Sequence, residues 1–238
     1  MGGYLDIEWA LEHSAPVGPQ IYRLLRERII RAELEPGASI SEAEIARAFA
    51  VSRQPVREAF IKLAEDGLVE IRPQRGTMIR KISLDSVMDA RFVREAVETD
   101  ISKLVAERAG ADLIAELRAQ IAEQRKTIGR HPDEFMKLDE QFHRALAVAA
   151  GKAQVYRLVH NVKAQMDRVR FLTLMNRSVI EISIDQHSVI VDAIETGDAG
   201  ATEAAMRVHL RRVLVDLPHV AAIKPEYFES LNVQSVAA

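Results

Sequence analysis

The spacing of apolar residues divides the chain into a short mixed segment and a long helical segment. Apolar positions recur every three to four residues over 19–30, and short helices are also indicated at about 41–49 and 52–66. Two β-prone runs follow at 68–71 and 77–79. Three helices followed by a hairpin predict a winged helix-turn-helix.

Residues that start or stop helices support these boundaries. Pro19 suits a first helical turn, and Ser41 with Glu44 has the form of a capping box. Ser52 can cap the third helix, and Gly67 suits the left-handed residue that ends it. The second and third helices are therefore expected to be joined by a tight turn.

From Ser83 onward the pattern is helical, with no strand signal. Helices are expected at about 84–109, 111–128, 132–150, 152–176, 178–195 and 198–217, separated by glycines and ended by Pro218. Six amphipathic helices with short connections predict an antiparallel bundle. The predicted fold is mainly α. A winged helix-turn-helix at 15–81 precedes an all-α bundle at 82–222, and a C-terminal tail occupies 223–238.

Composition excludes several classes of protein. The 238 residues contain no cysteine, which excludes disulfides, thiolate metal sites and a cysteine nucleophile. No apolar run approaches the ~18 residues of a membrane span, and the first residues do not resemble a signal peptide. A cytoplasmic protein without a membrane partner is therefore expected, associated with the nucleoid if it binds DNA.

The winged-helix segment carries side chains suited to DNA. Residues 18–81 hold 12 basic and 9 acidic side chains, although the whole chain has a net charge of −3. In a helix-turn-helix, the first turn of the second helix faces base edges, and here it contains Arg53, Gln54 and Arg57. The expected wing tip contains Arg75 and Gly76. Alternatively, the arginines form a solvated face paired with nearby glutamates.

Four ionisable residues fall on or beside the apolar faces of three predicted helices. Asp139 and His143 are four apart on one helix, while His187 and His209 lie on two others. Buried ionisable groups need partners, and a divalent cation is an economical partner for this set. Zn, Ni, Mn or Fe suits these ligands. Core histidines satisfied by hydrogen bonds are the alternative.

Two arginines could anchor an anionic ligand in the bundle. Arg94 lies on the apolar stripe of its predicted helix, and Arg170 borders the stripe of another. We expect both to bind a small carboxylate effector. An ordinary ion pair with Glu98, four residues along the same helix, is the alternative for Arg94.

A continuous set of residues in the N-terminal segment resembles a known family. The run Val51-Ser52-Arg53-Gln54-Pro55-Val56-Arg57-Glu58-Ala59, with Asp66-Gly67-Leu68-Val69 and Arg75-Gly76, resembles the DNA-binding domain of GntR-family transcriptional regulators. The resemblance implies that Ser52, Arg53, Gln54 and Arg57 contact an operator and that Arg75-Gly76 is the wing contact. Ala43 stands where the family often has a DNA-contacting arginine.

The C-terminal segment resembles the FCD effector domain of the FadR subfamily. The residues that carry this resemblance are Asp139-x-x-x-His143, His187-x-x-Ile190 and Met206-x-x-His209-Leu210. Six helices are typical of the VanR-like branch of this subfamily. Members with this Asp and these three His bind a divalent metal, and a bound carboxylate metabolite completes its coordination. Gln186 stands where an acid is frequent.

The expected function is that of a homodimeric, metabolite-responsive transcription factor, a repressor in most relatives. Two winged helices would bind a palindromic operator in double-stranded DNA, with a hinge near Lys81-Ile82-Ser83. One alternative is a metal-dependent hydrolase, although no separate general base is found on the same faces. Another is a regulator in which the metal is only structural.

Overall fold

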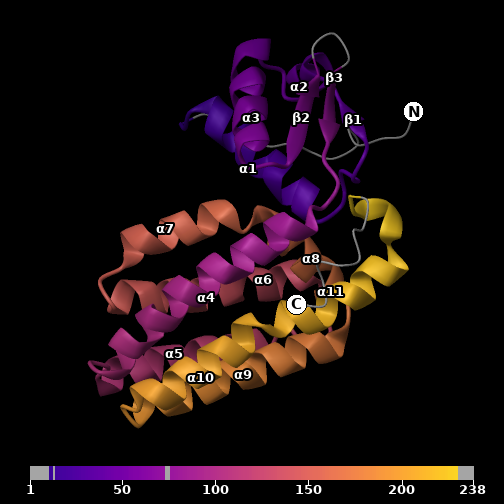
Figure 1. Ribbon diagram of the computed structural model, residues 1–238. Coiled ribbons are helices and arrows are strands. Elements are labelled where there is room, and N and C mark those ends of the chain that lie inside the picture. Colours follow the sequence, from indigo (N-terminus) through magenta and orange to yellow (C-terminus); the bar gives the residue numbers. More distant parts are fainter. Residues whose placement is uncertain (1–10, 13, 73–75, 230–238) are drawn as a thin grey trace. The chain divides into compact units, whose positions relative to one another are not determined.

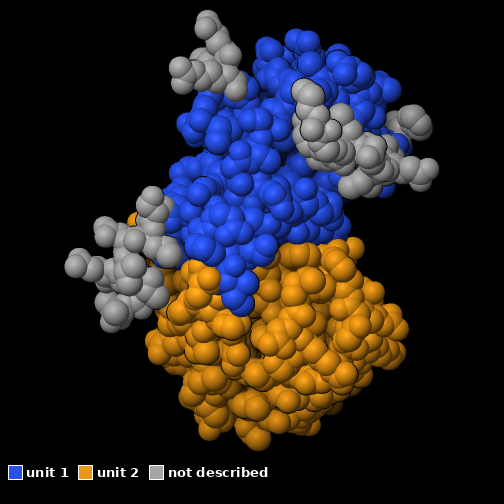
Figure 2. Space-filling model, turned by 90° about the vertical axis from the view of Figure 1, so that its right-hand side faces the viewer, with its two compact units in different colours: residues 1–84, 223–238 blue, residues 85–222 orange. Residues whose placement is uncertain are grey.

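The computed structural model describes residues 11–12, 14–72 and 76–229. The chain forms two compact units, which Figure 2 distinguishes by colour. Met1–Leu84 and Ile223–Ala238 belong to the first unit, and Asp85–Ala222 forms the second. The sequence predicts a separate C-terminal tail at 223–238. Its described part, up to Glu229, instead belongs to the first unit.

The first unit contains three helices and a small antiparallel sheet (Figure 1). In chain order its elements are α1 (Val17–Ile30), β1 (Ser39–Ile40), α2 (Glu42–Ala48), α3 (Arg53–Glu65), β2 (Val69–Arg72) and β3 (Gly76–Ile79). The strand order is β1-β3-β2, with Val69 opposite Ile79 and Ser39 opposite Met78. The predicted helix order and wing are confirmed. Strand β1 was not predicted, because two residues carry no periodic signal.

The helix ends agree with the sequence signals only in part. Gly67 has a φ of 70°, the left-handed conformation expected after α3. Ser41 and Ser52 occupy the N-cap positions of α2 and α3 with extended backbones, but neither side chain makes a capping hydrogen bond. The predicted capping box is therefore wrong. The acidic side chains in the first turn of α2 still complement its helix dipole.

The second unit is a bundle of helices (Figure 1). In chain order they are α4 (Leu84–Ala106), α5 (Ala111–Arg125), α6 (Pro132–Ala149), α7 (Ala153–Val162), α8 (Ala164–Leu174), α9 (Arg177–Glu195), α10 (Ala199–Leu210) and α11 (Arg212–Ile223). Two helices of the six that were predicted are each divided in two. The expected 152–176 helix is interrupted at Lys163, and the expected 198–217 helix is interrupted at Arg211.

Local contacts account for these departures. Lys163 is 5% exposed, and its ammonium group lies 2.7 Å from Glu140 Oε2 and 3.2 Å from Asp167 Oδ1, so the break lets a charged side chain turn inward to two carboxylates. Pro218 does not end the last helix but lies inside α11. The carbonyl of Leu214 loses a partner there, and both residues are exposed, so water can replace the missing hydrogen bond.

The short 3-10 helix η1 (Pro225–Tyr227) completes the described chain and belongs to the first unit. Ile82 and Phe228 form a parallel bridge, and they are 1% and 2% exposed. Among the helices of the described residues, none is long and apolar enough to cross a membrane.

Candidate functional site

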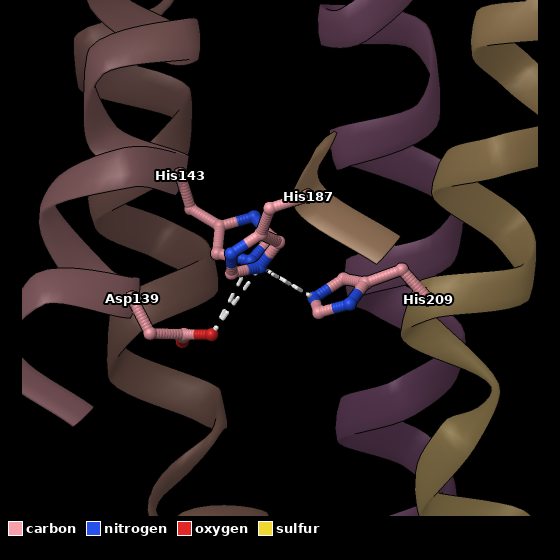
Figure 3. Close-up of side chains that lie close together, drawn as sticks. All are labelled: Asp139, His143, His187 and His209. Carbon is pink, nitrogen blue, oxygen red and sulfur yellow. Dashed lines mark hydrogen bonds and ion pairs between the residues drawn. The ribbon is translucent and has the colours of Figure 1, made fainter. Parts of the chain in front are cut away.

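The four predicted metal ligands meet in the interior of the helical unit (Figure 3). Helix α6 contributes Asp139 and His143, α9 contributes His187, and α10 contributes His209. One ligand atom from each residue lies within 4.8 Å of the other three, and all four residues are buried. The i,i+4 spacing on α6 places the carboxylate and the imidazole on one face. The sequence-based grouping is thus reproduced by the geometry.

The distances between ligand atoms suit a shared ion. The Nε2 atom of His209 lies 3.2 Å from that of His143 and 3.4 Å from that of His187. The Oδ1 atom of Asp139 lies 3.5 Å from His187 Nε2 and 4.0 Å from His143 Nε2. An ion ~2.1 Å from each ligand would separate neighbouring ligands by ~3.0 to ~3.4 Å, depending on its geometry. Small side-chain shifts would suffice to bind it.

Neighbouring polar side chains fix which nitrogen of each ring carries the proton. Gln124 donates from its amide nitrogen to the Leu138 carbonyl at 3.3 Å, which turns its Oε1 toward His187 Nδ1 at 2.8 Å. The oxygen can only accept, so Nδ1 of His187 carries the hydrogen. The unprotonated Nε2 then points into the cluster.

The other two rings are oriented in the same way. Glu98 Oε2 lies 2.6 Å from Nδ1 of His143, and Gln186 Oε1 lies 3.1 Å from Nδ1 of His209. Gln186, at the position where relatives often carry an acid, therefore does contact a ligand imidazole. The Nε2 atoms of all three rings are therefore directed at one point, where a divalent cation could be bound.

The protonation states also favour metal binding. Burial lowers the pKa of His187 to about 3 and that of His209 well below its usual value, so both rings are neutral at pH 7. Burial alone would raise the pKa of Asp139, but the charge of Arg170 holds it well below its usual range. Its Oδ1 atom is buried and accepts no hydrogen bond from the described residues. The residues therefore fit a divalent metal.

The two predicted effector anchors lie beside this cluster. Arg170 Nη2 is 2.7 Å from Asp139 Oδ2, the oxygen that faces away from the histidines. Arg94 donates to Glu98 through Nε at 2.5 Å, so the ordinary i,i+4 pair that was considered for it does form. Both members of that pair are buried, and Glu98 also contacts His143. Arg170 therefore contacts a candidate metal ligand directly, whereas Arg94 is connected to one through Glu98.

A small cavity adjoins the cluster. It measures about 30 Å³. Its polar lining consists of Arg94, Arg170, Thr173, Ser183, His209, Arg212 and Asp216. At roughly 10 to 15 Å³ per water, it has room for two or three water molecules. A carboxylate ligand would therefore have to displace lining side chains, and three arginines are in place to bind it.

One residue that orients an imidazole was not predicted from the sequence. Gln124 was not singled out, although it follows Leu117 and Ile121 on the buried face of α5. An amide on an otherwise apolar stripe is a signal that the sequence does contain. Arg212 was also missed, because no glycine or proline near Arg211 indicates that a new helix begins at Arg212.

The predicted DNA-contacting residues lie at the start of α3. Ser52, Arg53, Gln54 and Arg57 are all exposed. Arg57 donates to both carboxylate oxygens of Glu42 on α2, at 3.3 and 3.2 Å, rather than to a glutamate of its own helix.

The other polar contacts of this surface leave Arg53 available. Gln54 donates to Glu58 Oε1 at 3.0 Å. No ion pair of Arg53 is found within the described part of the chain. In the wing, Gly76 begins β3 with a φ of 85°, whereas Arg75 lies outside the described residues.

Comparison with known proteins agrees with both segments. Residues 18–79 match the family model "Bacterial regulatory proteins, gntR family", and residues 89–212 match the FCD domain. The HTH-type transcriptional repressor RspR of Escherichia coli K12 is 37% identical over 225 residues, which cover 94% of this chain and 99% of the relative. A transcriptional regulator of Streptomyces ambofaciens is 38% identical over 209 residues, covering 87% of this chain and 88% of the relative.

Solved structures share the fold. Escherichia coli McbR/YncC superposes with a TM-score of 0.72 at 15% identity and covers 90% of this chain and 99% of its own. A GntR regulator from Rhodococcus sp. RHA1 gives 0.68 at 23% identity and covers 86% and 98%. The chain therefore belongs to the GntR family, as a transcriptional regulator with an FCD domain and not an enzyme.

Proposed function

We propose that this regulator is a repressor whose operator binding is modulated by a small carboxylate metabolite bound at a divalent metal in the helical unit. One observation carries the proposal. Three imidazole lone pairs and the unpartnered Oδ1 of Asp139 converge beside a cavity lined by Arg94, Arg170 and Arg212. A cation would bind to the nitrogen and oxygen atoms of the cluster, and a carboxylate would bind to the cation and to the guanidinium groups.

Each residue of the site has a distinct role in this proposal. Asp139, His143, His187 and His209 would hold the ion, which supplies a positive charge that a carboxylate can bind. Nitrogen and oxygen ligands without sulfur suit Zn, Ni, Mn or Fe. The residues Glu98, Gln124 and Gln186 orient the imidazoles, and Arg170 orients Asp139.

The carboxylate would be held by the arginines of the cavity. Arg94 and Arg170 are paired with Glu98 and Asp139, and Arg212 donates to Asp216 at 3.0 and 3.1 Å. A ligand carboxylate can compete for these guanidinium groups because bidentate contacts to arginine are strong. The ligand changes DNA binding only if it has different affinities for two arrangements of the protein.

On the DNA side, Ser52, Arg53, Gln54, Arg57 and Gly76, with the undescribed Arg75, would contact a palindromic operator. The helix N-terminus adds partial positive charge toward phosphates. Repressor names among the relatives, including a probable D-xylose utilization operon repressor of Paenarthrobacter nicotinovorans, support the sign of regulation.

A palindrome requires two copies of the chain, and two neighbouring helices present suitable surfaces. Helix α4 exposes Phe92 between acidic side chains, whereas α7 exposes Leu158 and Val162 beside Arg157. The two helices are neighbours, because Tyr156 on α7 interacts with the charge of Arg94 on α4. We propose a homodimer in which α4 of each copy faces α7 of the other, since their charges are complementary.

Selection of operator DNA tests the regulatory proposal. The purified protein is incubated with fragmented DNA of its own genome, once with chelator and once with Zn²⁺ or Mn²⁺, and the bound fragments are sequenced. A few enriched sites that share a short palindrome are expected. No enrichment in either condition would refute the proposal.

The metal role is tested separately, because a structural metal is the competing interpretation. Replacing His187 by Ala should abolish the response of operator binding to carboxylates while the variant remains folded. A variant that unfolds, together with wild-type DNA binding that no carboxylate alters, would favour a purely structural metal.

A further inference from the structure

The chain passes between its two units twice, and the two crossing segments are joined to each other. The first crossing is at Leu84–Asp85 and the second at Ala222–Ile223. On the first unit, just outside these crossings, Ile82 pairs in parallel with Phe228. We call residues 225–229 the C-terminal strap.

Two backbone hydrogen bonds hold the strap to the linker. The amide of Ile82 donates to the Tyr227 carbonyl at 2.8 Å, and the amide of Glu229 donates to the Ile82 carbonyl at 3.0 Å. Both polar backbone groups of Ile82 are therefore satisfied by the strap. The backbone at Ile82 cannot rotate freely unless the strap is released.

Side chains hold the strap to the winged-helix unit as well. Phe228 is 2% exposed and Tyr227 is 8% exposed, so both rings are buried. The hydroxyl of Tyr227 donates to Glu35 Oε1 at 3.0 Å in the loop after α1. At the surface, Arg80 lies 3.2 Å from Glu229. Burial of Phe228 dominates this set, since the ion pair is exposed to solvent.

The strap is the direct continuation of the helix that lines the effector cavity. Helix α11 contributes Arg212, Val213 and Asp216 to the cavity lining and then runs without interruption to Ile223. Tyr227 is 18 positions after the metal ligand His209. Helix α11 thus connects the cavity lining along the chain to the segment that holds the linker.

We propose that the C-terminal strap clamps the linker at Ile82 and reports the state of the effector cavity, through α11, to the DNA-binding unit. The reporting role rests on the proposed function, whereas the clamp does not. The clamp also restricts which of residues 81–83, the hinge predicted from the sequence, can act as the hinge. Of residues 81–83, only Ser83 follows the clamped residue.

Limited proteolysis tests the clamp on the full-length protein. Trypsin cleaves after Lys81, which is exposed, but the Lys81–Ile82 bond must first leave the bridge to enter the protease. Mass spectrometry follows the appearance of the fragment that ends at Lys81. This fragment should appear at least about ten-fold faster in Phe228→Ala than in wild type. A factor of ten corresponds to ~1.4 kcal/mol of local stability.

A matched control distinguishes release of the strap from a general effect of substitutions in the C-terminal segment on the cleavage rate. Ile223→Ala removes a side chain that is 60% exposed in the same terminal segment, so its cleavage rate should equal that of wild type. Tyr227→Phe removes only the hydroxyl contact to Glu35 and should give a smaller increase, a comparison that remains available if Phe228→Ala does not fold. Equal cleavage rates in wild type and in the folded strap variants would overturn the clamp.

The reporting role has its own readout. Once an operator has been selected, its affinity for the protein is measured with and without Zn²⁺ and carboxylates. These additions should alter the operator affinity of wild type more than that of Phe228→Ala. Equal responses in the two proteins would overturn reporting alone. A wild type that binds operator but responds to no addition would overturn both the proposed regulation and reporting, while the cleavage result still decides the clamp.

Discussion

At the residue scale, the orientation of three imidazole rings determines what the helical unit can bind. Gln124 and Gln186 each accept from an Nδ1 atom, and Glu98 Oε2 lies 2.6 Å from Nδ1 of His143, so the Nε2 atoms of the three rings face one another in a buried space. Two of the rings are kept neutral by burial, which favours a metal ion over a proton. The ligand set is therefore preorganised before any ion arrives.

Stabilisation by metal is the direct consequence. Zn²⁺ at 100 times its Kd should stabilise wild type by ~2.7 kcal/mol, which corresponds to a rise in Tm of about 5 to 10 °C. His187→Ala should lose this rise. His219→Ala, which removes an exposed histidine of α11, should retain it. The rise in Tm on adding Zn²⁺ is measured by thermal unfolding. Equal rises in both variants would show that Zn²⁺ does not bind at the cluster.

Arg53 is the side chain on which specific DNA recognition is expected to depend most. It is exposed at the start of α3, and no ion pair in the described part of the chain has to break before it reaches a base. Arg53→Ala should weaken specific operator binding by ~1 to 3 kcal/mol in fluorescence anisotropy. Arg177→Ala, which removes the same charge from an exposed position on α9, should change affinity little. An unaltered footprint for Arg53→Ala would exclude Arg53 from the contacts.

At the element scale, a buried carboxylate joins α4 to α10. Glu95 is 6% exposed, and its oxygens lie 2.7 Å from Arg91 and 2.7 Å from Arg207, with further contacts to Arg211. Hydrogen bonds from Arg211 and Arg207 lower the pKa of Glu95 to about 2, against the effect of burial. The pair of helices is thus held together by a charge network as well as by packing.

Acid should weaken this junction. Because the pKa of Glu95 is lower in the folded state than in the unfolded state, its stabilisation is complete above about pH 4.5 and is lost as pH falls toward about 2. Glu95→Gln should lower the free energy of unfolding by ~1 to 3 kcal/mol at pH 7 and by much less near pH 2, in urea titrations. Glu181→Gln, in an exposed pair with Arg177, should have little effect at either pH. A pH-independent difference for Glu95→Gln would contradict this assignment.

The sequence predicted the order of helices, the wing and the inward-facing positions of Asp139, His143, His187 and His209, because each depends on periodicity along a helix or strand. It did not predict the helix breaks at Lys163 and Arg211, since each break involves contacts with residues far away in the chain, Glu140 and Glu95. Gln124 was missed for the same reason. Its importance depends on His187, which is 63 residues further along.

At the scale of the whole molecule, the proposed regulation involves two copies of the chain and a connection between the two units of each copy. The proposed dimer predicts that Leu158→Asp, which places a charge on a residue that is 65% exposed on α7, should shift sedimentation toward the monomer. Met175→Asp alters a similarly exposed apolar residue, 64% exposed, at the end of α8 and should leave the dimer intact. Identical sedimentation of the two variants would exclude the α7 surface.

The most direct test of metabolite control is operator affinity itself. The metal-loaded protein is titrated with its selected operator in the presence of a panel of small mono- and dicarboxylates. At least one carboxylate should change Kd by about five-fold or more, and His187→Ala should still bind the operator but no longer respond. An operator affinity that stays constant with every carboxylate, with and without metal, would contradict regulation through this site.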